Sequence, residues 1–201
     1  DAASNSAVIR KHLDKNDKVF HGDIFGSPFF ILKDAENVPD TTMNEIAHAT
    51  VCFSRAWREA LYGVSAYWVL PDQVKKSAPS GEFLPKGSFT IEGQRNFIKS
   101  ETLKLAVGII QLEDNDHVLT CGPPEAIKKN SICYAIIEPN GLEMAECAKK
   151  IRLEFLKIFE DITRKINIDE FVRALPAGKS QIKEISLGDL EKEKFIDNEL
   201  D

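Results

Sequence analysis

The sequence predicts an α+β fold, with a mainly antiparallel sheet, flanking helices and a small α/β carboxy-terminal appendage. Three observations predict it. Short stretches rich in β-branched and aromatic residues recur between clusters of turn residues. Two longer stretches, 42–62 and 142–162, carry apolar residues at helical spacing. With 201 residues, 43% of them hydrophobic, the chain can bury one substantial core.

Residues 1–115 are expected to hold the main sheet and the helix that covers it. A short first helix, capped by Ser4 or Ser6, should reach Leu13. The strands of this sheet are expected at residues 19–21, 28–32, 64–70, 89–91 and 103–112.

The helix across this sheet is expected at 42–62. Thr42 and Glu45 have the T-x-x-E spacing of a capping box, and Gly63 is a residue type that commonly ends a helix. Its apolar stripe should face the core. Arg55 and Arg58 lie off the stripe and should face solvent or a partner.

Residues 116–201 are expected to form the carboxy-terminal α/β extension with an acidic tail. Its predicted elements are strands at 118–120 and 133–137, a short helix at 125–129 and the long helix at 142–162. The outer face of the long helix is rich in lysine, which is typical of a solvated face; contact with a polyanion is the alternative. The tail beyond Leu190 should be frayed or disordered.

The charge is uneven along the chain. A net charge of −6 argues against a generic polyanion-binding protein. Residues 180–201 contain three lysines against seven acidic residues, whereas 55–99 contain seven Lys/Arg against four acidic residues. The acidity therefore belongs largely to the tail, and the 55–99 stretch can still meet an anion.

No feature of the sequence predicts a metal, a disulfide or a membrane span. The cysteines are far apart and never in a C-x-x-C pair, at Cys52, Cys121, Cys133 and Cys147. No apolar run approaches the roughly 20 residues of a spanning helix. The separated cysteines suit a reducing cytoplasm. Because the chain begins at Asp1 without a methionine, we expect a fragment of a longer protein.

The stretch 67–97 carries the strongest functional pattern. Its cations Lys75, Lys76, Lys86 and Arg95 are interleaved with aromatic residues, namely Tyr67, Trp68, Phe83, Phe89 and Phe97. Phosphates attract cations and unpaired bases attract flat apolar faces, so the mixture suits RNA. The alternative is that the aromatic residues belong to the core and the lysines to a solvated loop.

Several motifs in this region resemble the RNA-binding domain of the NFACT family. They are Trp68 to Val74, Ala78-Pro79-Ser80-Gly81-Glu82-Phe83-Leu84, Gly87-Ser88-Phe89 and Gly93 to Phe97, preceded by His21-Gly22-Asp23-Ile24-Phe25-Gly26-Ser27 and by Asp1-Ala2 with Asn5. The resemblance covers about residues 1–110. Because separate motifs occur in the family's order, it is specific.

The resemblance implies an RNA-binding domain of a ribosome-associated quality-control protein. Its expected partners are rRNA or tRNA on the large ribosomal subunit and the upstream domains of the family. Lys75, Lys76, Lys86, Arg95 and Lys99 would bind phosphates, Trp68 would stack or brace the loop, and His21 with Asp23 would shape the neighbouring turn. Glu92 and Gln94 stand where many relatives have cations, which implies a weaker phosphate contact there.

Other functions have less support in the sequence. His21 and Asp23 could form a metal-binding or acid–base pair, but a metal would need a third ligand and none stands at a diagnostic spacing. Neither Ser27 nor Ser80 lies in a G-x-S-x-G elbow. We therefore expect no catalytic site and no cofactor. A protein-interaction module without direct RNA contact remains the main alternative, because the chain is acidic and some bacterial relatives are described as fibronectin-binding.

Overall fold

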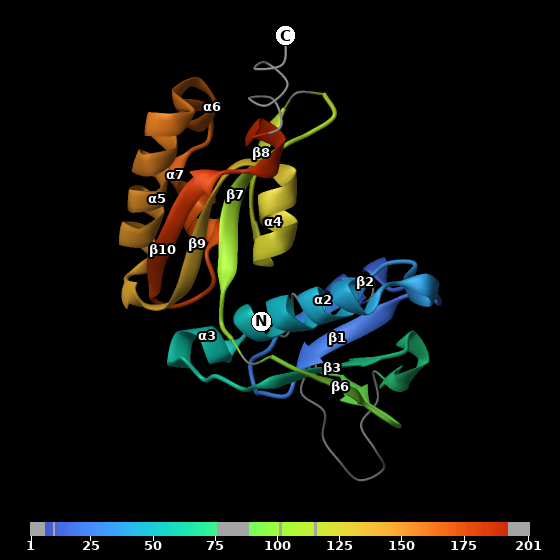
Figure 1. The fold of residues 1–201 in the computed structure, drawn as a ribbon. Coiled ribbons are helices and arrows are strands. Elements are labelled where there is room, and N and C mark those ends of the chain that lie inside the picture. Colours follow the sequence, from blue (N-terminus) through green and yellow to red (C-terminus); the bar gives the residue numbers. More distant parts are fainter. Residues whose placement is uncertain (1–6, 10, 76–88, 101, 115, 193–201) are drawn as a thin grey trace. The chain divides into compact units, whose positions relative to one another are not determined.

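The computed structural model describes residues 7–9, 11–75, 89–100, 102–114 and 116–192 (Figure 1). The chain divides into two compact units, Asp1–Ala56 with Leu61–Thr102 and Trp57–Ala60 with Leu103–Asp201. Each unit contains an antiparallel sheet with helices packed against it. The α+β class predicted from the sequence is confirmed.

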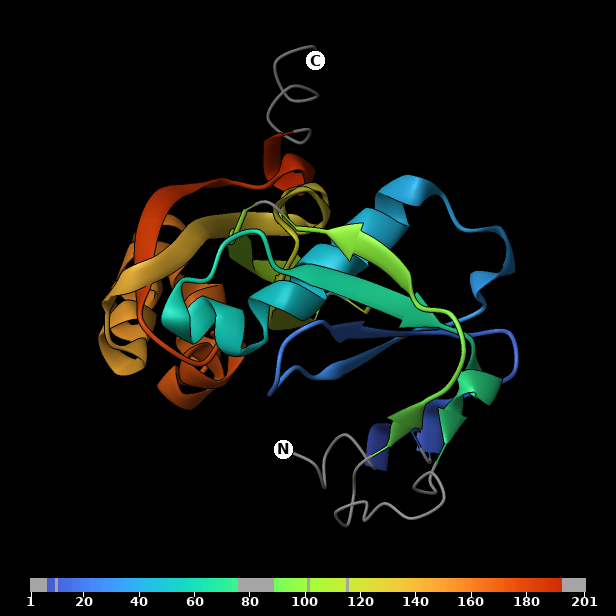
Figure 2. The same ribbon diagram turned by 90° about the horizontal axis from the view of Figure 1, so that it is seen from below.

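The first unit is built on a sheet of four strands in the order β2-β1-β3-β6. Figure 2 shows β6 beside β3, at the edge of this sheet. The described elements of the unit are β1 (Lys18–Gly22), β2 (Phe29–Leu32), η1 (Ala35–Asn37), α2 (Asp40–Cys52), β3 (Ser65–Val69), η2 (Pro71–Gln73), β4 (Val74–Lys75), β5 (Thr90–Ile91) and β6 (Asn96–Lys99). Residues 7–9 and 11–12 are also helical, as expected for the first helix.

The two faces of this sheet carry different side chains, because successive residues of a strand point to opposite sides. Helix α2 packs against one face, the side of Phe20 and Trp68. On the other face Val19, Tyr67 and Val69 form a core cluster. Residues of the first helix and of the β4-β5 hairpin pack against that cluster, namely Ile9, Leu13, Val74 and Ile91.

The helix predicted at 42–62 is interrupted, and this prediction was wrong in length. Helix α2 ends at Cys52, and a short helix α3 follows at Arg55–Glu59. The Ser54 hydroxyl donates to the Val51 oxygen at 2.6 Å and accepts from the Ala56 N–H at 3.1 Å. Such local side-chain bonds compete with the helical ladder, which explains the break.

The last strand of the first sheet also differs from the prediction. The stretch 89–91 contributes only β5, which pairs with β4 in a separate hairpin. The strand that completes the sheet is β6, a short segment of four residues paired to β3. Its brief alternation of polar and apolar residues, just after Gly93, was too short to stand out as a strand.

The second unit has a sheet in the order β10-β9-β7-β8. Its described elements are β7 (Leu105–Gln111), β8 (His117–Gly122), α4 (Pro124–Asn130), β9 (Ser131–Leu142), α5 (Met144–Ile158), α6 (Glu160–Lys165), α7 (Ile168–Ala174) and β10 (Ser180–Leu187). Figure 1 shows α4 and α5 on opposite sides of this sheet. Strand β7, predicted within the first sheet, lies in this one, because its apolar run pairs with the equally apolar β9.

Two further details of the second unit depart from the sequence prediction. The helix expected at 142–162 is divided between α5 and α6 by Phe159, whose backbone is extended (φ −135°, ψ 74°). Strand β10 was not predicted, because it is rich in polar residues and a bulge between Ile182 and Glu184 interrupts its alternation. In the described part of the chain, no helix is long and apolar enough to cross a membrane.

Candidate nucleic-acid interface

Four ring side chains form a row across the first sheet, one from each strand. Phe29 pairs in register with His21, His21 with Tyr67, and Tyr67 with Phe97. The centroids of these neighbouring rings are 4.7, 5.8 and 5.6 Å apart. Because paired residues of adjacent strands share a face, the registers of the three strand pairs together align all four rings. We call Phe29, His21, Tyr67 and Phe97 the aromatic row.

The end of the aromatic row at β6 reaches the surface and carries a cation. The Arg95 guanidinium lies 4.8 Å from the centre of the Tyr67 ring, which is the distance of a cation–π contact. Tyr67 is only 5% exposed, whereas Phe97 is 55% exposed. Lys99 follows Phe97 by two residues on the same strand, so it points to the same face. An exposed flat ring therefore lies between two cations.

His21 is half-buried within the row and acts there as a packing group. Burial lowers the pKa of His21 below 6.5, and the nearby Arg95 lowers it further, although a hydrogen bond at Gly22 opposes the shift. Its Nδ1 lies 3.5 Å from the Tyr67 hydroxyl. Burial also raises the pKa of Tyr67 above 10. Near neutral pH both rings are therefore uncharged, and neither supplies a positive charge for a phosphate.

The turn after β1 is fixed by the hydroxyl of Ser27. This oxygen accepts the N–H of Gly22 at 2.8 Å, and the N–H of Asp23 is bonded to the Ser65 oxygen at 2.8 Å. Gly26 has a positive φ of 81°, a conformation that favours glycine. The Asp23 side chain is exposed. The motif from His21 to Ser27 is thus a rigid turn, and its shape depends on a serine that the sequence had not singled out for this role.

Gln73 holds the segment that carries Arg95. Its amide oxygen accepts the N–H of Leu70 at 2.9 Å, and its amide nitrogen donates to the oxygens of Glu92 at 2.8 Å and Gln94 at 2.9 Å. The first bond closes η2 locally, and the other two tie η2 to the residues just before β6. Arg95 is therefore placed over Tyr67 by a side chain 22 positions earlier in the sequence.

The structure brings together only part of the predicted site. His21, Arg95 and Lys99 share one face of the sheet, with Asp23 at the adjoining turn. Lys75 is half-buried on the β4-β5 hairpin. Lys76 and Lys86 lie outside the described residues.

Trp68 lies on the opposite face, the side of α2, where the Lys18 ammonium is 5.2 Å from the centre of its ring. It is the neighbour of Tyr67 in β3, so strand geometry separates the two aromatic residues that the sequence had grouped.

The region offers no set of metal ligands in the described part of the chain. There, no group of three or more His, Cys, Asp or Glu side chains is positioned to hold an ion. His21 faces the rings of Phe29 and Tyr67. The arrangement has the chemistry of a binding surface, with a flat apolar ring flanked by cations.

Comparison with known proteins gives a consistent result. Residues 1–93 match the family model described as "NFACT protein RNA binding domain". The chain is 36% identical to the "Archaeal Rqc2 homolog aRqcH" of Methanocaldococcus jannaschii over 90% of this chain and 26% of that protein. It is 31% identical to the "Ribosome quality control complex subunit NEMF homolog" of Drosophila melanogaster, over 85% of this chain and 16% of that protein.

The chain thus spans about a quarter or less of the length of these relatives. Because the archaeal match covers 90% of the chain, it includes most of the second unit as well. A solved structure, the carboxy-terminal part of the fibronectin/fibrinogen-binding protein from Streptococcus suis, aligns at 22% identity with a TM-score of 0.41, over 50% of this chain and 37% of that one.

Proposed function

Residues 1–93 belong to the NFACT RNA-binding domain family, and from this premise we propose that the first unit binds RNA in ribosome-associated quality control. The proposed ligand is rRNA or tRNA on the large ribosomal subunit. The upstream parts of a longer protein would act beside it. We further propose that the domain works in the cytoplasm as a binding module and not as an enzyme, and that residues 116–201 form a carboxy-terminal α/β extension.

The observation that carries the proposal is the exposed end of the aromatic row. Phe97 presents a flat ring, and Arg95 and Lys99 lie before and after it on the same face. A base stacked on such a ring gains roughly 1–3 kcal/mol, and the cations on either side can meet the flanking phosphates. This spacing of ring and charge is what a single-stranded segment of RNA requires.

The overall acidity does not oppose this surface. Exposed charges farther apart than the Debye length of about 8 Å are largely screened in physiological salt. The acidic excess of the sequence is concentrated in residues 180–201, whereas the two cations of the proposed surface lie on one face, on either side of Phe97. A phosphate bound at this surface would lie within that length of both cations, so they would contribute directly to the contact.

The proposal is tested by a salt titration of binding to tRNA and to rRNA fragments. A double variant, Arg95→Gln with Lys99→Gln, removes two proposed phosphate contacts. Because each contact to single-stranded RNA adds about 0.7 to the slope of log K against log salt, the double variant should reduce that slope by about 1.4. Its affinity at low salt should fall at least about tenfold.

The matched control is Lys165→Gln with Arg173→Gln, an exposed lysine and arginine on α6 and α7 of the second unit. It changes the net charge equally and should leave both slope and affinity near those of the parent protein. Equal effects of the two double variants would mean that only net charge matters, and the assignment of the surface would be wrong.

A protein-interaction role is a second candidate, favoured by one residue. Phe25 is 87% exposed, although it lies in the turn that Ser27 and the Asp23 N–H hold rigid. A large apolar side chain displayed on a fixed turn is typical of an interface anchor. Partners that stay bound to the protein after nuclease and high salt, and are lost with Phe25→Ser, would support this second function.

A further inference from the structure

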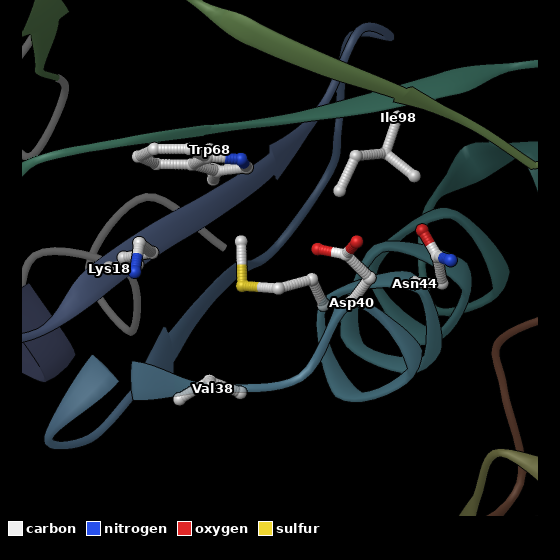
Figure 3. A pocket seen from close by; sticks show the side chains of 7 residues that line it. Lys18, Val38, Asp40, Asn44, Trp68 and Ile98 are labelled. Atoms are coloured by element: carbon white, nitrogen blue, oxygen red, sulfur yellow. The ribbon is translucent and has the colours of Figure 1, made fainter. Parts of the chain in front are cut away.

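A pocket lies on the α2 side of the first sheet, opposite the aromatic row (Figure 3). Its volume is about 450 Å³, within the range of about 300–1,000 Å³ that is typical of small-ligand pockets. The lining residues come from β1, the η1–α2 connection, α2, β3 and β6: Lys18, Val38, Asp40, Met43, Asn44, Trp68 and Ile98. All of them belong to the first unit.

One part of the pocket combines a flat ring with a cation. Trp68 is half-buried, and the Lys18 ammonium lies 5.2 Å from the centre of its ring. The same ammonium donates one hydrogen bond to the main-chain oxygen of Ala35, which leaves it two further N–H donors. A planar group in contact with Trp68 would therefore also lie close to a positive hydrogen-bond donor.

The first turns of α2 supply polar groups to the same pocket. Asp40 and Asn44 are four residues apart on the helix, so their side chains share a face. Figure 3 shows the Asp40 carboxylate turned toward the hollow that Trp68 borders. Among the described residues, none forms a hydrogen bond or ion pair with this carboxylate. Its oxygens can therefore accept hydrogen bonds from a ligand.

We propose that this pocket binds a guanine base. Guanine carries two adjacent donors, N1–H and the N2 amino group, and a carboxylate can accept both through its two oxygens. Its O6 and N7 are acceptors, which suit the Lys18 ammonium. Its flat face suits Trp68. Adenine, cytosine and uracil lack this pair of neighbouring donors, so they satisfy Asp40 less completely.

The inference rests on the proposed function, because it takes the guanine to be an unpaired base of the bound RNA. Sequence-specific readers of RNA use this combination of an aromatic face and hydrogen bonds to a base edge. Since β6 is the edge strand and its residues alternate between the two faces, one RNA strand could meet Phe97 on one side and Trp68 on the other. Phosphate contact and base selection would then belong to opposite faces of one sheet.

Tryptophan fluorescence can test the pocket directly. The protein has two tryptophans, and Trp57 is 1% exposed, so a bound base should quench mainly Trp68. The intact 201-residue chain is titrated with guanosine, inosine, adenosine and uridine 5′-monophosphates. Guanosine monophosphate should quench saturably, and inosine monophosphate, which lacks the N2 amino group, should bind about tenfold more weakly. In Trp68→Phe the quenching should disappear, which assigns the signal to the pocket.

Asp40→Asn is the decisive variant, since it keeps the side-chain shape and removes the charge and one acceptor. It should weaken guanosine monophosphate at least about tenfold and abolish the preference over inosine monophosphate. Asp72→Asn is the control, a first-turn aspartate on η2 of the same unit that is also exposed. A control that weakens binding as much as Asp40→Asn would overturn the proposal, as would a preference for another nucleotide or no saturable binding at all.

The experiments distinguish a failure of the proposed guanine pocket from a failure of the proposed RNA-binding function. If Asp40→Asn leaves guanosine monophosphate binding unchanged while Arg95→Gln with Lys99→Gln weakens RNA binding, the pocket assignment is wrong and the RNA-binding surface stands. If guanosine monophosphate binds through Asp40 but no RNA binds to the parent protein, the proposed function fails and the pocket is a nucleotide site.

Discussion

The side-chain amide nitrogen of Gln73 donates a hydrogen bond to the main-chain oxygen of Gln94 at 2.9 Å. Gln94 immediately precedes Arg95, whose guanidinium lies over Tyr67. The position of this cation therefore depends on a glutamine in the 3₁₀ turn that follows β3. A change at Gln73 should act on RNA binding through geometry, with no loss of a charged side chain.

We expect Gln73→Glu to weaken both folding and RNA binding. The carboxylate would still accept the Leu70 N–H, but it would face the oxygens of Glu92 and Gln94 without a donor. Losing two donated bonds and adding a repulsion should cost about 1–3 kcal/mol of unfolding free energy. The measurements are urea unfolding and RNA affinity at one salt concentration.

Gln94→Glu is the control for this variant, because it adds the same charge nearby and keeps the main-chain oxygen that Gln73 uses. If both variants lower RNA affinity to the same extent, the added charge explains the loss and the positioning role of Gln73 is refuted. A loss confined to Gln73→Glu supports it.

Phe97→Ala should reduce RNA affinity without a matching loss of salt dependence. The ring is 55% exposed, so its removal costs little core packing, while a stacked base would lose about 1–3 kcal/mol. The slope of log K against log salt should stay within error of the parent, because no cation is removed. Phe97→Trp should retain or raise the affinity, since tryptophan offers a larger face.

Val118→Ala is a suitable comparison for Phe97→Ala, because Val118 is a 39% exposed apolar residue of β8 in the second unit. It should leave RNA affinity unchanged. If Phe97→Ala lowers the salt slope as much as the double cation variant does, Phe97 acts by holding the cations and the stacking role is incorrect.

The aromatic row shows which part of the site could be predicted from the sequence. Tyr67 and Phe97 stood out together with Arg95 as interleaved rings and cations, but their joining to His21 and Phe29 depends on the register of three strand pairs. Register is a long-range property that turn geometry and burial determine together. The sequence alone therefore predicted the residue types and left their grouping open.

Trp68 shows which part of the site could not be predicted from the sequence. Adjacent positions in a stretch look equivalent in a sequence, yet alternation along β3 sends Trp68 to the α2 side and Tyr67 to the aromatic row. The pocket could not have been predicted, because Lys18 and Asp40 are 22 residues apart in the sequence and meet only after α2 folds over the sheet. Amphipathic patterns indicate which face is covered, but not which polar side chains meet at its rim.

A pH-dependent change in stability is expected from His21. Its folded pKa lies below 6.5 because of burial, so the unfolded chain takes up the proton first as the pH falls. The contribution of the neutral ring to stability is fully present above pH 6.5 and is lost as the pH falls toward the folded pKa. In that window the loss approaches about 1.4 kcal/mol per pH unit.

Urea unfolding at pH 7.5 and pH 5 measures this effect. The parent protein and the variants contain the same carboxylates, so the contribution of the carboxylates cancels when their pH dependences are compared. His21→Phe keeps a ring between Phe29 and Tyr67 and should lose less stability on acidification than the parent protein. His12→Gln, at an exposed position of the first helix, should behave like the parent. Parallel pH curves for the parent protein and His21→Phe would contradict the expectation.

Gly108→Ala should destabilise the second unit and leave RNA binding intact. A Cβ at this position of β7 would lie 2.5 Å from Cγ2 of Ile127 in α4, and 3.2 Å from the Cys133 main-chain oxygen. Ile127 is 4% exposed and its branch is stiff, so α4 must shift, at a cost of about 1–3 kcal/mol. Thermal unfolding and RNA affinity are the two measurements.

Gly122→Ala provides a matched control on the neighbouring strand β8. Its added Cβ would lie 3.6 Å from Cδ1 of the same Ile127, an ordinary van der Waals contact, so its stability should stay within about 0.5 kcal/mol of the parent. Adding Ile127→Leu to Gly108→Ala should restore part of the loss, because leucine has no branch at Cβ. If Gly108→Ala lowers RNA affinity while the first unit keeps its stability, the assignment of RNA binding to the first unit alone is wrong.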